Sequence, residues 1–376
     1  MRVMKNNPVM KSPKSADIAI TGRCNLRCKH CSHFSSPGDT NADLPLDEWK
    51  KFMDELGRLA VMSVTIEGGE PFCRDDLEEI IESAVANRMR FGVLTNGTLI
   101  TDETAAFLAS TGRCNSVQVS IDGSFPGTHD ALRGEGNFEK AVEGIGHLRK
   151  NGVRVTVRVT INRYNVGELD RIADFLLVET GLSGFSTNSA SHMGLCRSNA
   201  DEIQLSAEDR SLAMEKLLEL DKKYSGRISA AAGPLAELKH WTRMIKASRA
   251  GEKPASNQGK LSSCGGPLSK IAVRADGVMT PCLQMSHIEL GRINEDPLGE
   301  IWQSHPELVR LRERRRVSLT EFEFCRDCEY VSYCMGNCPA LAYNITGSDF
   351  RPSPDACLKQ FLESGGKIPE KALEHN

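Results

Sequence analysis

The stretch Gly22–His33, which reads GRCNLRCKHCSH, places three cysteines at Cys24, Cys28 and Cys31. Three thiolates so close together indicate a metal site, because thiolates select zinc, copper(I) or iron–sulfur clusters. A structural zinc ion needs four ligands in a closed tetrahedron, whereas a catalytic site keeps one position open. A [4Fe–4S] cluster has four irons, so these three cysteines would leave one iron free to bind something else. A redox motif and an incomplete zinc knuckle fit the spacing less well.

The composition around this stretch limits the class of protein. The chain has 376 residues, enough for two domains, and its 40% hydrophobic and 26% charged residues are ordinary for globular proteins. The net charge of −3 gives no electrostatic argument for binding nucleic acid. Because no apolar run could span a membrane and no secretion signal is visible, we expect a cytoplasmic protein without a membrane partner. Thirteen cysteines in a reducing compartment then indicate metal or redox chemistry.

Strand-like and helical segments alternate from about residue 16 to 200. Six strand candidates lie at 16–20, 63–69, 90–97, 115–123, 153–162 and 184–189. The helical stretch 47–59 places Trp49, Phe52, Met53, Leu56 and Leu59 on one face. Alternation of this kind implies parallel βαβ units. The sequence therefore predicts an α/β fold built as an open sheet or a partial barrel.

Two of the strand candidates carry polar residues on one face. The polar positions are Arg154, Thr156, Arg158 and Thr160 in one strand and Gln118, Ser120 and Asp122 in the other. Parallel strands covered by helices are normally apolar throughout, and polar groups shielded from water need partners. We infer a polar interior that holds a polar ligand. The alternative is an antiparallel edge strand with one face in solvent.

The C-terminal part of the chain has little apolar periodicity. A helical stretch and a polar linker (245–263) lead to cysteines at 264, 282, 325, 328, 334, 338 and 357, with a small hairpin expected to turn at Asp276-Gly277. The basic run 310–316 is interpreted as a solvated helical face, and docking of an acidic leader peptide is the alternative. The predicted organisation is an N-terminal segment (1–15), a barrel (16–215), a helical bridge and linker (216–263), a cysteine-ligated domain (264–360) and a tail (361–376).

The C-x₃-C-x₂-C spacing after the first strand candidate resembles the hallmark of the radical SAM superfamily. By that resemblance, Cys24, Cys28 and Cys31 are catalytic and hold a [4Fe–4S] cluster whose free iron chelates the amino and carboxylate groups of S-adenosylmethionine (SAM). Reductive cleavage of SAM then yields a 5′-deoxyadenosyl radical. The implied fold is a partial (β/α)6 TIM-like barrel.

Further residues resemble the SAM-binding elements of that superfamily. Gly68, Gly69 and Glu70 belong to an EGGEP segment similar to the GGEP element that binds the methionyl amine. Thr95 and Ser120 fall where related enzymes hold polar atoms of SAM, although ordinary capping of strand ends explains them equally well.

His30, Asp122 and Arg158 are three more candidates for cofactor binding. His30 takes the position usually given to an aromatic residue beside the adenine. Arg158 is a candidate for the SAM carboxylate, because a buried guanidinium needs an anionic partner. The alternative is a structural ion pair between Arg158 and a barrel acid such as Asp122.

The C-terminal cysteines resemble the seven-cysteine SPASM extension, with structural zinc sites as the alternative. The resemblance assigns Cys264, Cys282 and Cys338 to a first auxiliary cluster and Cys325, Cys328, Cys334 and Cys357 to a second, giving three [4Fe–4S] clusters with the SAM-binding one. Related sulfatase maturases have a fourth cysteine shortly before the position of Cys264, and this chain does not. One iron of the first auxiliary cluster is therefore expected to lack a thiolate, and the alternatives for its fourth ligand are water, Cys196, a carboxylate or the substrate itself. Cys73 and Cys114, and preferentially Cys196 too, are interpreted as small buried hydrophobic residues.

The resemblance favours an enzyme that modifies a peptide or protein, by crosslinking or by oxidising a side chain. A tetrapyrrole enzyme of heme biosynthesis and a sulfatase-type maturase are the alternatives, and a non-catalytic iron–sulfur or zinc scaffold is a different class. Only 15 residues precede the expected barrel. A leader peptide would therefore bind the barrel directly or through a separate small protein. The implied electron donor is a flavodoxin or ferredoxin.

Overall fold

Ten strands form one continuous sheet in the computed structural model, which describes residues 9–34, 42–262 and 264–374. The strand order is β10-β9-β8-β1-β2-β3-β4-β5-β6-β7. The strands are β1 (Ser15–Thr21), β2 (Ser63–Gly68), β3 (Arg90–Thr95), β4 (Cys114–Ser120), β5 (Val155–Ile161), β6 (Phe185–Ser189), β7 (Ile228–Ala230), β8 (Lys270–Val273), β9 (Val278–Thr280) and β10 (Gly291–Arg292).

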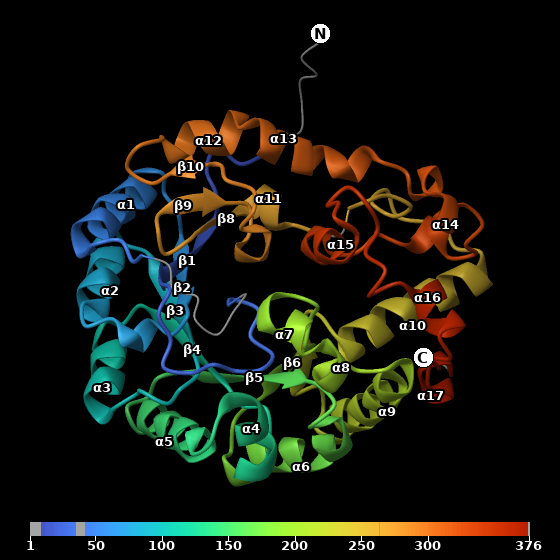
Figure 1. Cartoon of the computed structure of the whole chain (residues 1–376), viewed down its shortest axis with the longest axis horizontal. Coiled ribbons are helices and arrows are strands. Elements are labelled where there is room, and N and C mark those ends of the chain that lie inside the picture. The colour runs from blue at the N-terminus through green and yellow to red at the C-terminus, as the bar shows by residue number, and fades with distance from the viewer. Residues whose placement is uncertain (1–8, 35–41, 263, 375–376) are drawn as a thin grey trace.

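Helices follow the strands and form a ring around the sheet (Figure 1). Up to residue 250 they are α1 (Leu46–Arg58), α2 (Leu77–Ala86), α3 (Asp102–Ser110), α4 (Pro126–Arg133), α5 (Asn137–Lys150), α6 (Leu169–Asp174), α7 (Gly194–Ser198), α8 (Ala200–Ile203), α9 (Ala207–Lys223) and α10 (Pro234–Ala250). The C-terminal helices are α11 (Gly266–Ser269), α12 (Leu298–Ser304), α13 (Pro306–Glu313), α14 (Glu323–Arg326), α15 (Pro339–Thr346), α16 (Leu358–Glu363) and α17 (Glu370–Leu373).

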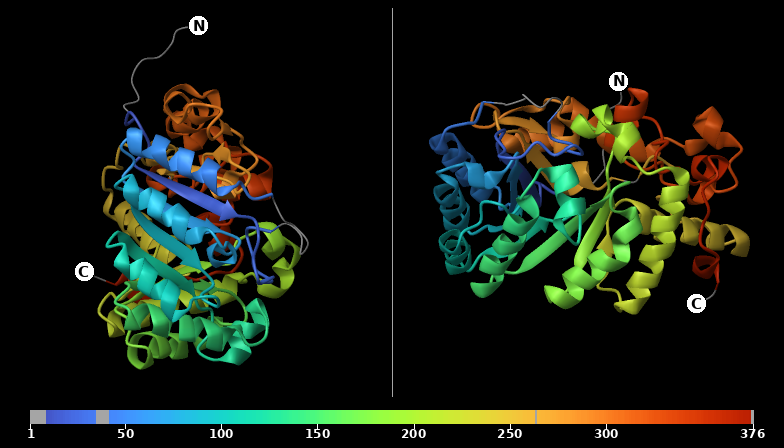
Figure 2. Two further views of the ribbon diagram at one scale, coloured as in Figure 1. Left: turned by 90° about the vertical axis from the view of Figure 1, so that its left-hand side faces the viewer. Right: turned by 60° about the horizontal axis from the view of Figure 1, so that its bottom comes forward.

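The six strands predicted from the sequence all form, and neighbouring members of β1–β6 pair in parallel. The parallel register of β4, β5 and β6 excludes the antiparallel edge considered above. Helices α1, α2 and α3 lie along the outside of this sheet (Figure 2, blue to teal). The predicted α/β class with a partial barrel is confirmed.

Helix α1 illustrates how the outer layer is held. Its side chains Trp49, Phe52, Met53 and Leu56 are fully buried, as the apolar stripe predicts. The fifth predicted residue, Leu59, is the C-terminal cap of the helix and is only partly buried. The core therefore lies between the helices and the outward faces of the strands, which leaves the inward faces to form a site.

The C-terminal segment extends the barrel sheet. Strand β8 pairs in parallel with β1, and β9 returns antiparallel to β8 after the predicted turn, where Gly277 has φ of 85°. Strand β7, from the segment expected to be a helical bridge, adds to the other edge beside β6. The elements that follow β10 complete the ring in Figure 1. No helix in the described part of the chain is long and apolar enough to cross a membrane.

Candidate active site

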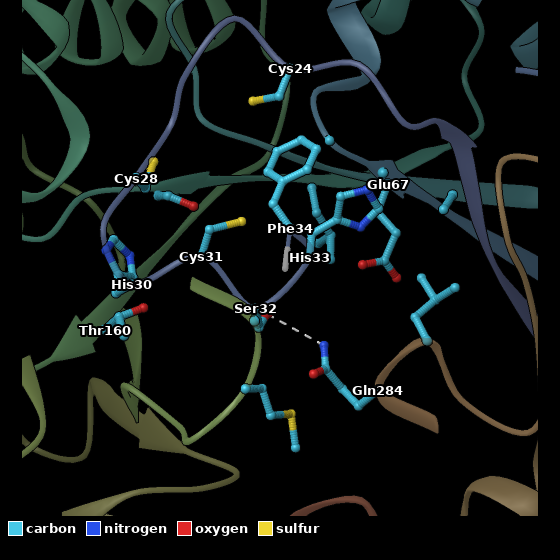
Figure 3. Close-up of a pocket in the computed structure, with 18 of the residues that line it drawn as sticks. Cys24, Cys28, His30, Cys31, Ser32, His33, Phe34, Glu67, Thr160 and Gln284 are labelled. Atoms are coloured by element: carbon cyan, nitrogen blue, oxygen red, sulfur yellow. Dashed lines mark hydrogen bonds between the residues drawn. The ribbon is translucent and has the colours of Figure 1, made fainter. Parts of the chain in front are cut away.

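The three N-terminal cysteines lie on the loop of residues 22–34, here called the cluster loop, which leaves the end of β1. Asp43 fixes the start of this loop, because its carboxylate accepts from Gly22 N at 2.8 Å and from Thr21 Oγ1 at 2.7 Å. All three cysteines line a cavity of about 670 Å³. Figure 3 shows the three side chains arranged along the loop around this cavity.

The cavity is formed by the inward faces of the barrel strands and by loops at their carboxyl ends. Its polar lining residues include Gln118, Ser120, Thr160, Asn188 and Ser189. The polar interior that the alternating strands predicted is thereby confirmed. The C-terminal region also reaches this cavity, since Gln284 donates to Ser32 Oγ at 3.5 Å (Figure 3).

Gly68 and Gly69 allow the end of β2 to touch the cluster loop. A Cβ on Gly68 would lie 2.3 Å from Thr21 O, and one on Gly69 would lie 2.2 Å from Arg23 O. The backbone N–H of Gly69 also donates to Thr21 O at 2.9 Å. Both glycines border the cavity, and the close approaches they allow are to Thr21 at the end of β1 and to Arg23 in the cluster loop.

Glu70 is completely buried and its carboxylate is bound by its own neighbours. Oε1 accepts from Thr95 Oγ1 at 2.7 Å, and Oε2 accepts from Asn96 N at 2.7 Å. Thr95 Oγ1 in turn accepts from Gly97 N at 2.9 Å. This hydrogen bond is the capping of a strand end that the sequence analysis gave as the alternative role of Thr95. Burial raises the pKa of Glu70 to about 7. Glu70 thus links the end of β2 to the end of β3 and the loop after it by hydrogen bonds. Thr95 and Asn96 line the cavity.

Asp122 lies behind the cluster loop in a buried charge network. Its Oδ2 is 2.7 Å from Arg133 Nε and 3.2 Å from His30 Nε2, while Oδ1 accepts from Thr160 N at 2.7 Å. Despite burial, the charge of Arg133 and the hydrogen bond with His30 hold the pKa of Asp122 well below its usual range. The other ring nitrogen of His30, Nδ1, is buried without a hydrogen-bond partner and His30 lines the cavity.

Arg158 does not form the ion pair with Asp122 that was considered from the sequence, because Arg133 occupies that carboxylate. Arg158 Nε is buried without a hydrogen-bond partner, and Glu67 is the acid whose charge acts on it. Burial lowers the pKa of Arg158, and burial raises the pKa of Glu67 to about 7. Figure 3 shows the Glu67 carboxylate within the cavity.

Among the seven C-terminal cysteines, electrostatic effects run within the two predicted sets. Burial, together with the charges of Cys264 and Cys338, raises the pKa of Cys282 to about 11. Burial and repulsion from Cys334, Cys357 and Cys328 likewise raise the pKa of Cys325 to about 12. In the described part of the chain, no three His, Cys, Asp or Glu residues are gathered tightly enough for a single metal ion.

Two family models match the chain. One, described as the radical SAM superfamily, matches residues 18–176, and the other, the SPASM iron–sulfur cluster-binding domain, matches residues 264–329. The chain belongs to the radical SAM superfamily and carries a SPASM domain. It is therefore an enzyme of that superfamily.

Relatives of this radical SAM enzyme differ in how much of it they resemble. The AdoMet-dependent heme synthase of Methanosarcina barkeri is 28% identical over 350 residues, covering 91% of this chain and 96% of the relative. The mycofactocin maturase MftC of Mycobacterium tuberculosis is 39% identical over 155 residues, covering 41% of this chain and 39% of the relative. The crystal structure of Streptococcus suis SuiB bound to precursor peptide SuiA superposes with a TM-score of 0.70 at 17% identity, covering 93% of this chain and 77% of SuiB.

The residues of the cluster loop fit an iron–sulfur cluster. They offer three soft thiolate donors toward one cavity, which suits a cluster that keeps one iron open. Burial raises the pKa of Cys24 to about 12 and that of Cys28 to about 11, so iron must displace protons from both thiols. Arg133 opposes the shift at Cys28, with Nη1 3.9 Å from its Sγ.

Glu67, Asn96 and Arg133 are cavity residues to which the sequence analysis gave no role. Glu67 is the first residue of the EGGEP segment and Asn96 directly follows Thr95, so both lie in or beside the motifs already recognised. Arg133 ends α4 and no motif marks it. The three spare cysteines are small packed residues: Cys196 is fully buried with Leu132 and Ile203, and Cys73 and Cys114 are partly buried.

Proposed function

We propose that this enzyme cleaves SAM reductively and uses the 5′-deoxyadenosyl radical to abstract hydrogen from a substrate at the cavity. The observation that carries this proposal is the cluster loop itself, whose three thiols line a polar cavity and form no disulfide with one another. A [4Fe–4S] cluster held by Cys24, Cys28 and Cys31 would supply one electron to SAM, giving methionine and the radical.

The chain's own residues bind and orient SAM in this scheme. Asn96, Ser120 and Thr160 offer hydrogen bonds along one wall of the cavity, and His30 Nδ1 is free to accept or donate one. Arg158 is the candidate for the carboxylate of SAM, because its buried Nε lacks a hydrogen-bond partner and it lies on β5 two residues before Thr160; Arg158 itself is not among the residues that line the cavity. Gly68 and Gly69 line the cavity, and their backbone is the proposed contact for the methionyl end. These roles extend the predicted set of site residues and stand as proposals.

For the substrate we propose a tetrapyrrole, whose side chain would be oxidised. Support comes from the heme synthase of M. barkeri, whose similarity runs through both the barrel and the SPASM domain. The cavity has the size of one small-molecule site and must also hold SAM, so it admits only the reacting edge of a macrocycle. Loss of one further electron from the substrate radical completes a two-electron oxidation, and the two cysteine groups of the SPASM domain would hold the acceptor.

A peptide substrate is the second candidate. Two observations favour it: the higher identity to the mycofactocin maturase within the matched 155 residues, and the polar lining of the cavity, which suits peptide groups. A carrier protein for the peptide and a flavodoxin or ferredoxin as reductant belong to this proposal. The number of clusters, three, is proposed from the ten cysteines of the cluster loop and the two C-terminal groups.

The test is an anaerobic assay of the reconstituted enzyme with SAM and dithionite. Formation of 5′-deoxyadenosine is measured alone, with an iron porphyrin bearing propionate side chains, and with the peptide encoded beside the gene. Stimulation by the porphyrin together with a porphyrin product of changed mass supports the first candidate. Stimulation by the peptide alone supports the second. A protein that binds iron but never forms 5′-deoxyadenosine would contradict the radical reaction itself.

A further inference from the structure

The basic run 310–316 is not the solvated face that its sequence suggested. Arg312 has only 5% of its surface exposed and Arg314 only 3%. Arg312 lies on the buried side of α13, and Arg314 is the first residue of the short turn that follows this helix. Buried guanidinium groups are costly unless they are paired, so this segment needs a reason for its two buried charges.

A second cavity of about 460 Å³ lies beside this segment. Its charged lining residues are Lys260, Arg312, Arg314, Arg315 and Arg316, and Cys264 of the first auxiliary group also lines it. The described lining residues include no aspartate or glutamate, and none of them lines the SAM cavity. Exposure rises from Arg312 and Arg314 through the half-buried Arg315 to the exposed Arg316, so positive charge continues from the interior to the surface.

The guanidinium group of Arg312 makes two contacts within the protein, but one of its nitrogens has no hydrogen-bond partner. Its Nε donates to Pro267 O at 2.8 Å, and its guanidinium carbon lies 4.7 Å from the centre of the Trp302 ring. These two contacts fix the plane of the guanidinium. Its Nη2 is buried and has no hydrogen-bond partner. A buried N–H group of a cation that has no hydrogen-bond partner is what an oxyanion would bind.

The acids nearby are already used elsewhere. Glu313 pairs with Arg316 at 2.8 Å, and Asp349 pairs with Arg310 at 2.7 Å. Arg314 donates from Nε to the backbone oxygen of Asp349 at 2.6 Å, so a carbonyl and not a carboxylate satisfies that nitrogen. Arg312 and Arg315 have no carboxylate within ion-pair distance among the described residues. The positive charges of Arg312 and Arg315 are therefore not balanced by a described carboxylate, whereas Asp349, Cys264 and Cys338 act on Arg314.

We propose that this cavity is a separate binding site for a small anionic ligand carrying a carboxylate or a phosphate group. Arg312 Nη2 would donate to the anion at the buried end, and Arg315 and Lys260 would balance its charge nearer the surface. Since Cys264 borders the cavity, the ligand would lie next to the first auxiliary group, where its negative charge favours the oxidised state of any cluster held there.

The test is isothermal titration of the reconstituted enzyme, under anaerobic conditions without SAM, with inorganic phosphate, pyrophosphate or succinate. The two phosphate probes and the dicarboxylate distinguish the two sources of negative charge. Arg312→Gln is compared with Arg310→Gln, a matched arginine on the same helix that pairs with Asp349 outside the cavity. We expect one saturable site whose Kd rises at least about tenfold in Arg312→Gln and stays unchanged in Arg310→Gln.

If Arg312→Gln does not fold, Arg315→Gln replaces it, because Arg315 is half-buried and its loss leaves the core intact. Absence of saturable binding by all three probes at millimolar concentration would overturn the proposal. So would equal affinity in the wild type and the cavity variants. Binding of an acidic peptide with no affinity for the small anions would also overturn it, and would instead identify a docking surface.

Discussion

Arg133 Nε and Asp122 Oδ2 lie 2.7 Å apart in an ion pair that has almost no contact with solvent. The pair joins the last residue of α4 to the end of β4, and Arg133 Nη1 continues to Cys28 Sγ at 3.9 Å. Because Asp122 also accepts from the backbone of Thr160, one carboxylate connects two barrel strands, a helix and the cluster loop. The position of Cys28 thus depends on the buried ion pair between Arg133 and Asp122.

Replacement of Arg133 by Gln should leave the Asp122 carboxylate buried without its cation. Loss of one partner from a buried pair costs about 3–5 kcal/mol of unfolding free energy, measured here by chemical denaturation under anaerobic conditions. The control is Lys150→Gln, which breaks an exposed pair with Asp102 and should cost less than about 1 kcal/mol. Equal losses of unfolding free energy in the two variants would show that the buried pair stabilises the protein no more than the exposed pair does.

Replacement of Gly69 by Ala should disturb the cluster loop directly. The new Cβ would lie 2.2 Å from the backbone oxygen of Arg23, so the loop must move by more than a side chain can absorb. We expect a loss of about 1–3 kcal/mol in stability and a lower iron content after reconstitution. Gly146→Ala in α5, where no atom lies within 4 Å, should keep full iron content and be neutral or stabilising. Normal iron binding by Gly69→Ala would contradict the tight contact.

The barrel was predictable because its signals are local. The apolar stripe from Trp49 to Leu56 and the alternation around Arg158 depend only on periodicity, and the spacing of Cys24, Cys28 and Cys31 is contained in eight residues. The turn at Gly277 is equally local. Each of these features therefore appears where the sequence placed it.

The remaining features depend on contacts between distant segments. Arg133 and Asp122 pair across a turn and a helix, and nothing in the sequence distinguishes Arg133 from Arg158 as the partner. The burial of Arg312 depends on Trp302 and Pro267, which belong to other elements. The pairing of β8 with β1 joins residues more than 250 positions apart. Periodicity cannot report such contacts.

Changing Cys24, Cys28 and Cys31 together to Ala should remove about four of about twelve irons per chain and abolish SAM cleavage. These thiols are the ligands available on the wall of the SAM cavity. Iron analysis and 5′-deoxyadenosine formation are measured on the same preparation. Cys73→Ser serves as the control, since Cys73 is a partly buried cysteine outside the three groups. Continued formation of 5′-deoxyadenosine by the triple variant would refute the assignment.

Glu67 should make stability depend on pH. Burial and the charge of Asp17 raise its pKa to about 7, against opposition from Lys270 and Arg158. Since the folded-state pKa exceeds the unfolded value, the stabilisation by the bound proton is complete below about pH 4.5 and is lost as pH rises through about 7. Glu67→Gln should therefore raise Tm at pH 8 and leave it unchanged near pH 4.5, as followed by thermal unfolding. A constant difference between the two proteins across this range would exclude titration of Glu67.

The first auxiliary group should retain an open coordination position, because Cys264, Cys282 and Cys338 are the three cysteines assigned to it and, among the described residues, no other cysteine acts on Cys282. Cys196 does not join them, since it is fully buried with Leu132 and Ile203. The described acid whose charge reaches Cys282 is Asp17, and that carboxylate is held by Lys270 at 3.0 Å.

The measurement uses the Cys24, Cys28 and Cys31 triple-Ala variant, which keeps both auxiliary groups, and records its reduced EPR spectrum with and without a small thiol. An open iron accepts the thiol as a fourth ligand, so one of the two auxiliary signals should shift while the fully ligated group stays constant. Asp17→Asn in the same background is the control for closure by a side chain. A spectrum that ignores the thiol but changes in Asp17→Asn would show that Asp17 occupies the position and that substrate does not bind there.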